Sequence, residues 1–199
     1  MPAEWDIRYW PQCLRHVFLS HCQEDRETLV RPVFEELGRR GFSPWIDEVH
    51  YPISRQGFET LREELLTCRH VVYFLTPAAL RQGRGWMQAE RAYADTIQSR
   101  LAYHGEMAHV ELPLLFIARD DPVYQRSSWR ALLDKAQVYD QISAPVEWAA
   151  TRIELFIRQE EDWARDLATR FAQDNRLSDH FSHDPNLRRR LLAESPPPG

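Results

Sequence analysis

The clearest strand signal in the chain is His70-Val71-Val72-Tyr73-Phe74-Leu75-Thr76, which is followed at once by Pro77. Apolar, β-branched and aromatic residues occupy both faces of this run. Such a pattern is typical of a strand buried on both sides inside a parallel sheet. The run therefore predicts a central strand of an α/β fold.

Weaker strand signals lie on both sides of this run. We predict the strands at 16–20, 42–47, 70–76, 110–118 and 138–139. Apolar residues at helical spacing predict the helices between them, including one that carries Leu61 and Leu65, one that starts near Trp86 and a short one at 128–135. This alternation predicts a flavodoxin-like, five-stranded parallel sheet with helices on both faces. Ligands bind such sheets beyond the C-terminal ends of the strands.

The first helix has a start signal, a stop signal and one conflict. Asp25 is a candidate N-cap, and Gly41 is a candidate stop after the two arginines at 39 and 40. Pro32 conflicts with a helix that begins at Asp25, because proline disrupts a helix interior. We therefore expect the helix either to begin near residue 28 or to kink at Pro32.

The pattern changes after the last predicted strand. Residues 1–13 are predicted to be an N-terminal arm, and residues 14–144 the α/β domain. Residues 145–174 predict a C-terminal helical extension, either one long helix or a helical pair. Residues 175–199 are polar and proline-containing and are expected to be partly disordered.

Composition excludes several classes of protein. The chain has 199 residues and a net charge of −5, which disfavours general nucleic-acid binding. The sequence contains no run of about 18 apolar residues, so it predicts no membrane span, and the first residues do not resemble a secretory signal. Three cysteines without a C-x-x-C pair favour a reducing, cytoplasmic setting. His180 and His183 lack further ligands nearby, so we predict no metal site.

Phosphate-binding loops are absent from the sequence. The chain has only seven glycines, and no Gly-rich nucleotide motif is present. Of the 25 basic residues, all but Lys135 are arginine. We interpret most of this bias as codon bias of a GC-rich genome, but arginine also suits bidentate contact with phosphate.

Short motifs occur in a defined order between residues 14 and 140. They are Val17-Phe18-Leu19-Ser20-His21 with Glu24-Asp25, Gly41-Phe42-x-x-Trp45-Ile46-Asp47, a loop ending at Gly57-Phe58, Cys68 to Pro77, Trp86-x-x-x-Glu90, and Glu111-Leu112-Pro113-Leu114-Leu115-Phe116. In this order they resemble the TIR (Toll/interleukin-1 receptor) domain family, and the loop at 48–57 resembles the family's BB loop. Some TIR domains are scaffolds, and others, including many bacterial ones, cleave NAD+ at the nicotinamide–ribose bond. The resemblance implies that Glu90 is the catalytic residue of the second kind.

Chemistry gives an independent argument for Glu90. Nicotinamide in NAD+ is already cationic and leaves as a neutral base, so no general acid is needed. The transition state is oxocarbenium-like, and a carboxylate aimed at the ribose stabilises it. Trp86 lies one helical turn earlier on the same face and is placed to exclude water. The alternative is that Trp86 belongs to the core and Glu90 is a surface acid beside Arg91.

The resemblance also suggests substrate-binding positions. Phe18, Ser20 and His21 end the first strand, where the nicotinamide or its ribose would lie. Trp45 and Asp47 end the second strand, although Asp47 equally suits a structural role in pinning the loop. In the loop at 48–57, Tyr51 is a candidate for stacking on adenine. Arg55 is a candidate for binding the pyrophosphate.

The resemblance implies partners and a setting. Enzymatic TIR domains assemble head to tail, with the BB loop of one subunit completing the site of its neighbour. We therefore expect self-association through residues 48–57. NAD+ is expected as a substrate and no cofactor is expected. An anti-phage defence role is expected, through NAD+ depletion or a linear or cyclic ADP-ribose signal, with a separately encoded sensor or effector.

Two other functions remain open. One is a non-catalytic TIR adaptor or a virulence factor that binds other TIR domains and leaves NAD+ intact. The other is a nucleoside deoxyribosyltransferase, which shares a flavodoxin-like fold and also uses a glutamate. The presence of Glu90 in Trp86-x-x-x-Glu90 favours the NAD+-cleaving enzyme over both.

Overall fold

Strand β3 (Cys68–Leu75) lies at the centre of a five-stranded sheet, as its apolar sequence predicts. The computed structural model describes residues 15–47, 61, 64–65, 67–81, 85–103, 110–116, 121–125, 129–139 and 143–173. The other strands are β1 (Arg15–Ser20), β2 (Pro44–Trp45), β4 (Val110–Leu115) and β5 (Gln137–Val138). All neighbouring pairs are parallel, in the order β2-β1-β3-β4-β5. The predicted fold class is confirmed.

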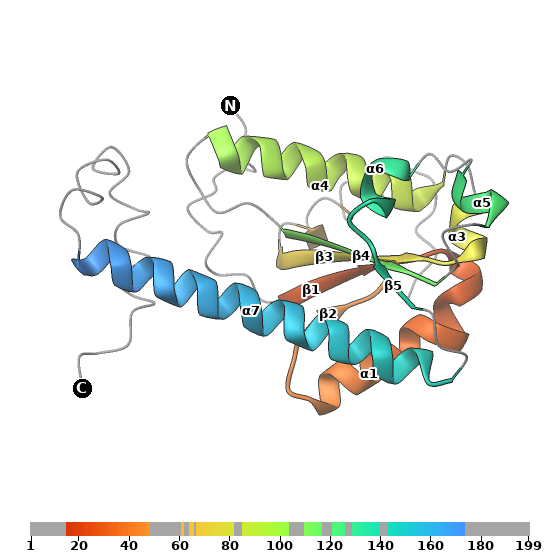
Figure 1. Ribbon diagram of the computed structural model, residues 1–199, viewed down its shortest axis with the longest axis horizontal. Coiled ribbons are helices and arrows are strands. Elements are labelled where there is room, and N and C mark those ends of the chain that lie inside the picture. The colour runs from red at the N-terminus through yellow and green to blue at the C-terminus, as the bar shows by residue number, and fades with distance from the viewer. Residues whose placement is uncertain are drawn as a thin grey trace. The chain divides into compact units, whose positions relative to one another are not determined.

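Helices cover both faces of the sheet (Figure 1). On one face lie α4 (Trp86–Tyr103) and α6 (Arg130–Leu133), and on the other lie α1 (Arg31–Arg39) and the first turns of α7 (Pro145–Gln173). The described elements also include the short helices α3 (Pro77–Arg81) and α5 (Pro122–Gln125). Successive side chains of a strand point to opposite faces of the sheet. Phe18 and Ser20 therefore point to the face covered by α4, and Val17 and Leu19 point to the face covered by α1.

The chain divides into two units. One is Gln12–Glu154 and contains the whole sheet, and the other combines Met1–Pro11 with Leu155–Gly199. In the second unit, the described residues continue α7 to Gln173 as one helix. The predicted arm at 1–13 and tail at 175–199 lie outside the described residues. Among the described helices, none combines the length and the apolar character needed to cross a bilayer.

The first helix begins later than either signal suggested. A 3-10 turn, η3 (Gln23–Asp25), and a π-helical turn, η4 (Arg26–Val30), precede α1, and Pro32 lies in the first turn of α1. Proline is tolerated in a first turn because the N–H groups there have no partner within the helix. Asp25 lies directly before η4 but its side chain makes no cap hydrogen bond, and Val30 is the N-cap of α1, which is a correction to the sequence prediction. Gly41 ends the helix with a φ of 86°, as its sequence position predicted.

Two strands, β2 and β4, are shorter than their sequence signals, and a third, β5, is shifted by one residue. Phe42 lies after α1 and outside β2, and its N–H caps the C-terminal end of α1 by donating to the carbonyl of Leu37 at 3.0 Å. Only Pro44 and Trp45 pair with β1. The fourth strand ends at Leu115, and the fifth covers Gln137–Val138 instead of 138–139.

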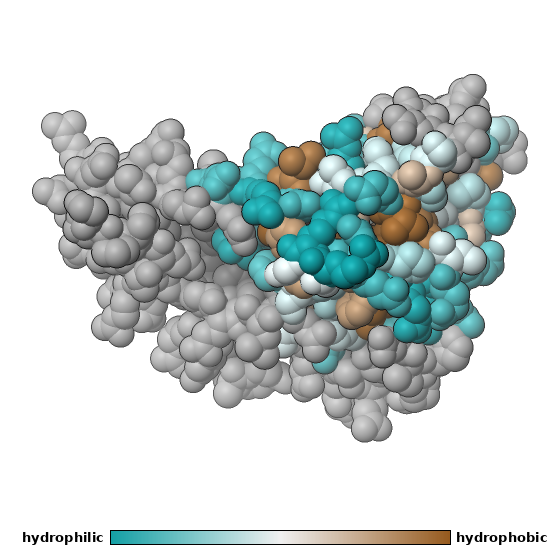
Figure 2. Space-filling view, turned by 90° about the horizontal axis from the view of Figure 1, so that it is seen from below, coloured by the Kyte–Doolittle hydropathy of each residue, from teal (hydrophilic) through white to brown (hydrophobic). Residues whose placement is uncertain are grey.

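Arg40 links α1 to the first turns of α7. Its guanidinium donates to Glu36 at 2.7 Å, Glu147 at 2.7 Å, Glu154 at 3.0 Å and Thr151 at 3.1 Å. The side chain is only 17% exposed. On this side of the molecule the described residues are mainly hydrophilic (Figure 2). The docking of the first turns of α7 therefore includes an ionic contribution as well as apolar burial.

Replacing Arg40 is expected to destabilise the protein by about 1–2 kcal/mol, between the values typical of exposed and buried ion pairs. In Arg40→Met, the carboxylates of Glu36, Glu147 and Glu154 lose their shared cation and repel one another. Urea unfolding of the full chain measures the effect. Arg39→Met is the matched control, because Arg39 also pairs with Glu36 but its side chain is 71% exposed. Equal losses in both variants would show that the Arg40 network adds no stability.

Candidate active site

Glu90 contacts the end of β1 from α4. The hydroxyl of Ser20 donates to Oε2 of Glu90 at 2.5 Å. Ser20 is the last residue of β1, and Glu90 lies one turn into α4. Glu90 is only 2% exposed, and Ser20 is fully buried. The carboxyl group is therefore held inside the protein at the C-terminal edge of the sheet, where ligands bind in such folds.

Burial alters the ionisation of Glu90. Loss of hydration raises the pKa of Glu90 from 4.5 to about 8, the Ser20 hydrogen bond opposes this rise, and the negative charge of Asp47 adds to it. At pH 7 the carboxyl of the ligand-free protein therefore retains its proton in most molecules. A cation bound beside it favours the ionised form.

Two aromatic rings lie on the same sheet face as Ser20. Phe18 and Trp45 are register partners on β1 and β2, and their rings stack with centroids 4.5 Å apart. Both residues are buried, at 1% and 6% exposure. This pair forms an apolar surface on the Glu90 side of the sheet.

Arg26 connects the ends of β1 and β2. Its Nε donates to Nε2 of His21 at 3.3 Å, and its Nη2 lies 3.5 Å from Oδ2 of Asp47. The other ring nitrogen of His21, Nδ1, lies 2.8 Å from the carbonyl of Leu19. Because a carbonyl only accepts, Nδ1 carries the hydrogen and Nε2 is free to accept from Arg26. Burial lowers the pKa of His21, which keeps the ring in this neutral form.

Asp25 connects the turn after β1 to the end of β3. Its Oδ2 accepts from the thiol of Cys22 at 2.7 Å and from the hydroxyl of Thr76 at 2.5 Å. Burial raises the pKa of Cys22 to about 12, so the thiol keeps its proton and remains a donor. The Thr76 oxygen in turn accepts from the N–H of Ala79 at 3.1 Å. The Asp25 carboxylate, which the sequence suggested as a helix cap, therefore binds Cys22 and Thr76 instead.

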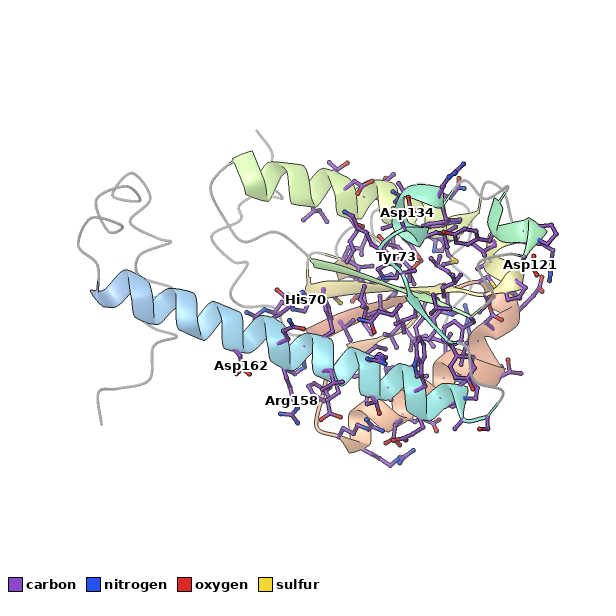
Figure 3. All side chains as sticks on the ribbon, in the orientation of Figure 1. His70, Tyr73, Asp121, Asp134, Arg158 and Asp162 are labelled. Atoms are coloured by element: carbon purple, nitrogen blue, oxygen red, sulfur yellow. The ribbon has the colours of Figure 1, made fainter. Side chains whose placement is uncertain are left out.

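A second carboxyl group on this sheet face, Glu111, also accepts from a hydroxyl and also has a raised pKa. Tyr73 points from β3 to the side covered by α4 and α6 (Figure 3), and its hydroxyl donates to Glu111 at 3.0 Å. Burial raises the pKa of Glu111, and the Tyr73 bond opposes that rise. The Tyr73 ring also contacts Trp129, over which Arg91 stacks. Glu111 thus provides a natural comparison for Glu90.

The structure brings together most of the residues that the sequence singled out. Six of them lie at the ends of β1 and β2 or on α4: Phe18, Ser20, His21, Trp45, Asp47 and Glu90. Trp86 begins α4 and is half-buried. Glu90 is buried, so it is not the surface acid of the alternative reading. Tyr51 and Arg55, with the rest of the loop at 48–57, lie outside the described residues.

Sequence reasoning missed Arg26 as a member of the site. In the sequence it is one charge among several in the turn after the first strand, and nothing local marks its partners. The one sequence feature that could have identified Arg26 is its position six residues after Ser20, where the first strand ends. Asp25 carried a signal as well, but it was read as a helix cap.

A family model for the TIR domain matches residues 17–141 of this chain. The chain belongs to the TIR domain family. The match begins within β1, covers the other four strands and includes both Ser20 and Glu90. The resemblance seen in the sequence motifs is therefore confirmed at the level of the family.

One curated relative of this TIR domain protein is an NAD(+) hydrolase TirS from Staphylococcus aureus (strain MSSA476). The two are 34% identical over 74 residues, which are 37% of this chain and 26% of the relative. This chain thus matches about a quarter of the length of that relative.

Two solved structures align weakly with this chain. A metazoan TIR-STING receptor from C. gigas, solved in complex with 2',3'-cGAMP, aligns with a TM-score of 0.44 and 15% identity over 70% of this chain and 39% of that one. The TIR domain of the Toll-related receptor TRR-2 from Hydra magnipapillata aligns with a TM-score of 0.38 and 14% identity over 61% of this chain and 97% of that one. Similarities at this level carry no argument about the site.

Proposed function

We propose that this TIR domain protein is an NAD+ nucleosidase that cleaves the nicotinamide–ribose bond, with Glu90 as its catalytic residue. The observation that carries the proposal is the buried Glu90 carboxyl, held by Ser20 at the C-terminal edge of the sheet. The hydrolase name of the Staphylococcus aureus relative supports it. The residues that serve substrate binding in this proposal are Phe18, Ser20, His21, Trp45, Asp47, Tyr51, Arg55 and Trp86.

The proposed reaction needs no acid to protonate the leaving group. The bond between the ribose C1′ and the pyridinium nitrogen breaks, and its electron pair stays on nitrogen, which releases neutral nicotinamide. The remaining ribosyl cation is captured by water, giving ADP-ribose, or by a nucleophilic nitrogen or hydroxyl of the same molecule, giving a cyclic product, and either route releases one proton. The Glu90 carboxylate stabilises the cation while it forms.

The burial of Glu90 bears on how the proposed reaction starts. At 2% exposure the carboxyl is covered, so a ribose reaches it only after neighbouring side chains move. The raised pKa of Glu90 means that this covered state holds a proton. The approach of the cationic nicotinamide ring then favours release of that proton and prepares the carboxylate for the reaction.

The wider biological setting is part of the same proposal. Self-association through residues 48–57 and adjoining surfaces is the event that we propose opens the site. The proposed role is cytoplasmic anti-phage defence, either by NAD+ depletion or by an ADP-ribose signal to a separately encoded effector, and the only small molecule required is the NAD+ substrate.

Product analysis tests this proposal. The full chain, at high concentration with a crowding agent, is incubated with NAD+ and the products are separated by chromatography and identified by mass spectrometry. We expect nicotinamide in equal amount to linear or cyclic ADP-ribose. NAD+ that stays intact under every assembly condition would overturn the proposal. Binding to another TIR domain in that case would favour an adaptor, and base exchange on deoxynucleosides would favour a deoxyribosyltransferase.

A further inference from the structure

Arg26 is largely buried and is paired with Asp47, the carboxylate whose charge acts on Glu90. Its side chain and that of Asp47 are each 12% exposed, so the pair is largely removed from water. The guanidinium uses two different nitrogen atoms for its two partners, Nε for His21 and Nη2 for Asp47. His21 directly follows Ser20 on β1, and Asp47 follows Trp45 and Ile46 beyond β2. One side chain therefore joins the ends of the two strands that flank the candidate site.

The backbone explains why Arg26 is available for this task. Arg26 is the first residue of the π-helical turn η4, whose Leu29 and Val30 are buried in the core. Pro32 places the start of α1 after this turn. A wider turn keeps the apolar residues directed inward while Arg26 lies beside the ends of the strands. Single π-helical turns occur often at functional sites for this kind of reason.

We infer that Arg26 is a positioning residue of the candidate active site, because it holds the ends of β1 and β2 together through His21 and Asp47 and neutralises the Asp47 carboxylate beside Glu90. Its kinetic consequence rests on the proposed function. The electrostatic coupling between Arg26 and Glu90 is a property of the folded chain, and it can be measured whether or not the protein cleaves NAD+.

The charges around Glu90 determine the direction of this coupling. The groups concerned are Asp47 after β2, Tyr73 on β3, the His21–Arg26 pair after β1 with Asp25 beside it, and Arg91 and Asp95 on α4. Of these, Asp47 acts on Glu90 directly by raising its pKa. Arg26 offsets the Asp47 charge, so its loss strengthens that effect. Loss of the Asp47 charge itself has the opposite effect.

Arginine is better suited to this role than lysine. A guanidinium is planar and offers several N–H donors in fixed directions, whereas an ammonium is a point charge on a flexible stem. Lysine at position 26 keeps the charge beside Asp47 but cannot hold His21 and Asp47 in one fixed geometry. The variant Arg26→Lys therefore tests alignment of the strand ends alone, because it retains the positive charge that neutralises Asp47.

The test uses Arg26→Gln, Arg26→Lys and Asp47→Asn, with Arg31→Gln as matched control. Arg31 is a nearby arginine whose partner, Glu27, is exposed. The ionisation of Glu90 is followed by carbon NMR of the carboxyl, assigned with Glu90→Gln. The pH profile of kcat/KM for nicotinamide release is measured on the same samples. Circular dichroism confirms folding, and Asp47→Asn still decides the electrostatic coupling if Arg26→Gln does not fold.

We expect the Glu90 titration midpoint to rise by about 0.5–1 pH unit in Arg26→Gln and to fall by about as much in Asp47→Asn. Arg26→Lys is expected to leave the midpoint nearly unchanged while raising KM by about 3–10-fold, because the strand ends are less well aligned. Arg31→Gln should resemble the wild type in both measurements. A purely structural role for Arg26 would move neither the midpoint nor the pH profile.

The outcomes separate this inference from the proposed function. An unchanged or lowered midpoint in Arg26→Gln, or an unchanged midpoint in Asp47→Asn, overturns the inference even if the protein cleaves NAD+. The expected opposite shifts in a protein that leaves NAD+ intact support the coupling and reject the proposed reaction. Shifts in the carboxyl titration together with matching shifts in the pH profile support both.

Discussion

Glu90→Gln is expected to slow nicotinamide release by a factor of about 10²–10³ or more, as is typical when one preorganised electrostatic group is removed from an active site. Glutamine has nearly the same shape and can still accept the hydrogen bond from Ser20, so the fold around it is retained. It carries no negative charge, and the forming ribosyl cation loses its stabilising partner. The initial rate of nicotinamide release measures the effect.

Two features of the experiment sharpen this result. First, kcat/KM of the wild type is expected to rise with pH towards about 8, because the reaction uses the ionised carboxyl, so the difference is largest above pH 8. Second, Glu111→Gln is the matched control, since Glu111 also has a raised pKa and also accepts from a hydroxyl, that of Tyr73. It is expected to keep a rate within about twofold of the wild type. Equal activity of Glu90→Gln and wild type would remove Glu90 from the mechanism.

The same substitution is expected to make the protein more stable in alkaline solution. Above pH 4.5 the Glu90 side chain of the unfolded chain has released its proton, whereas the folded protein retains that proton up to about pH 8. The folded state thus binds more protons in this window. Its stability falls as the pH rises from about 4.5 to about 8 and then levels off. Glutamine does not ionise, so this loss is absent from Glu90→Gln.

The size of the gain follows from the shift of the pKa. A tenfold change in an ionisation constant corresponds to about 1.4 kcal/mol, so the upper limit of the gain at pH 9 is about 3–5 kcal/mol. Urea unfolding of both proteins at pH 5, 7 and 9 measures it, and contributions from His21, Cys22 and Glu111 cancel in the difference. Glu27→Gln is the control, because Arg31 lowers the pKa of exposed Glu27 and no alkaline gain is expected. A difference that is independent of pH would show that Glu90 ionises normally.

Local patterns were sufficient to predict the sheet. Each strand signal was a run of apolar residues, and burial of such runs is a property of the residues themselves, so β1, β3 and β4 were found near their observed bounds. Alternation with helices then implied parallel pairing. The ends of the elements were predicted less well. Phe42 was assigned to a strand because it is apolar, whereas its backbone closes α1 through Leu37.

The site was predictable only in part because its members meet through tertiary contacts. Ser20 and Glu90 were each singled out, but their hydrogen bond joins residues separated by 70 positions and depends on the packing of α4 over β1. Asp25 was assigned to a helix start, whereas Cys22 and Thr76 supply its actual partners. Arg26 was overlooked for the same reason, since neither His21 nor Asp47 marks it in the sequence.

The strand order has a consequence for synthesis of the protein. β1 is the first described strand to leave the ribosome, yet its partners on the two sides are β2 and the more distant β3, and the carboxyl that contacts Ser20 arrives still later on α4. Parallel pairing of this kind forms only after the intervening chain has been synthesised. The entropy cost of bringing distant segments together is incurred before their contacts stabilise the sheet. A nascent chain that ends before α4 therefore contains Ser20, His21 and Asp47 but no Glu90. Under the proposed function, such incomplete chains leave cellular NAD+ untouched during translation.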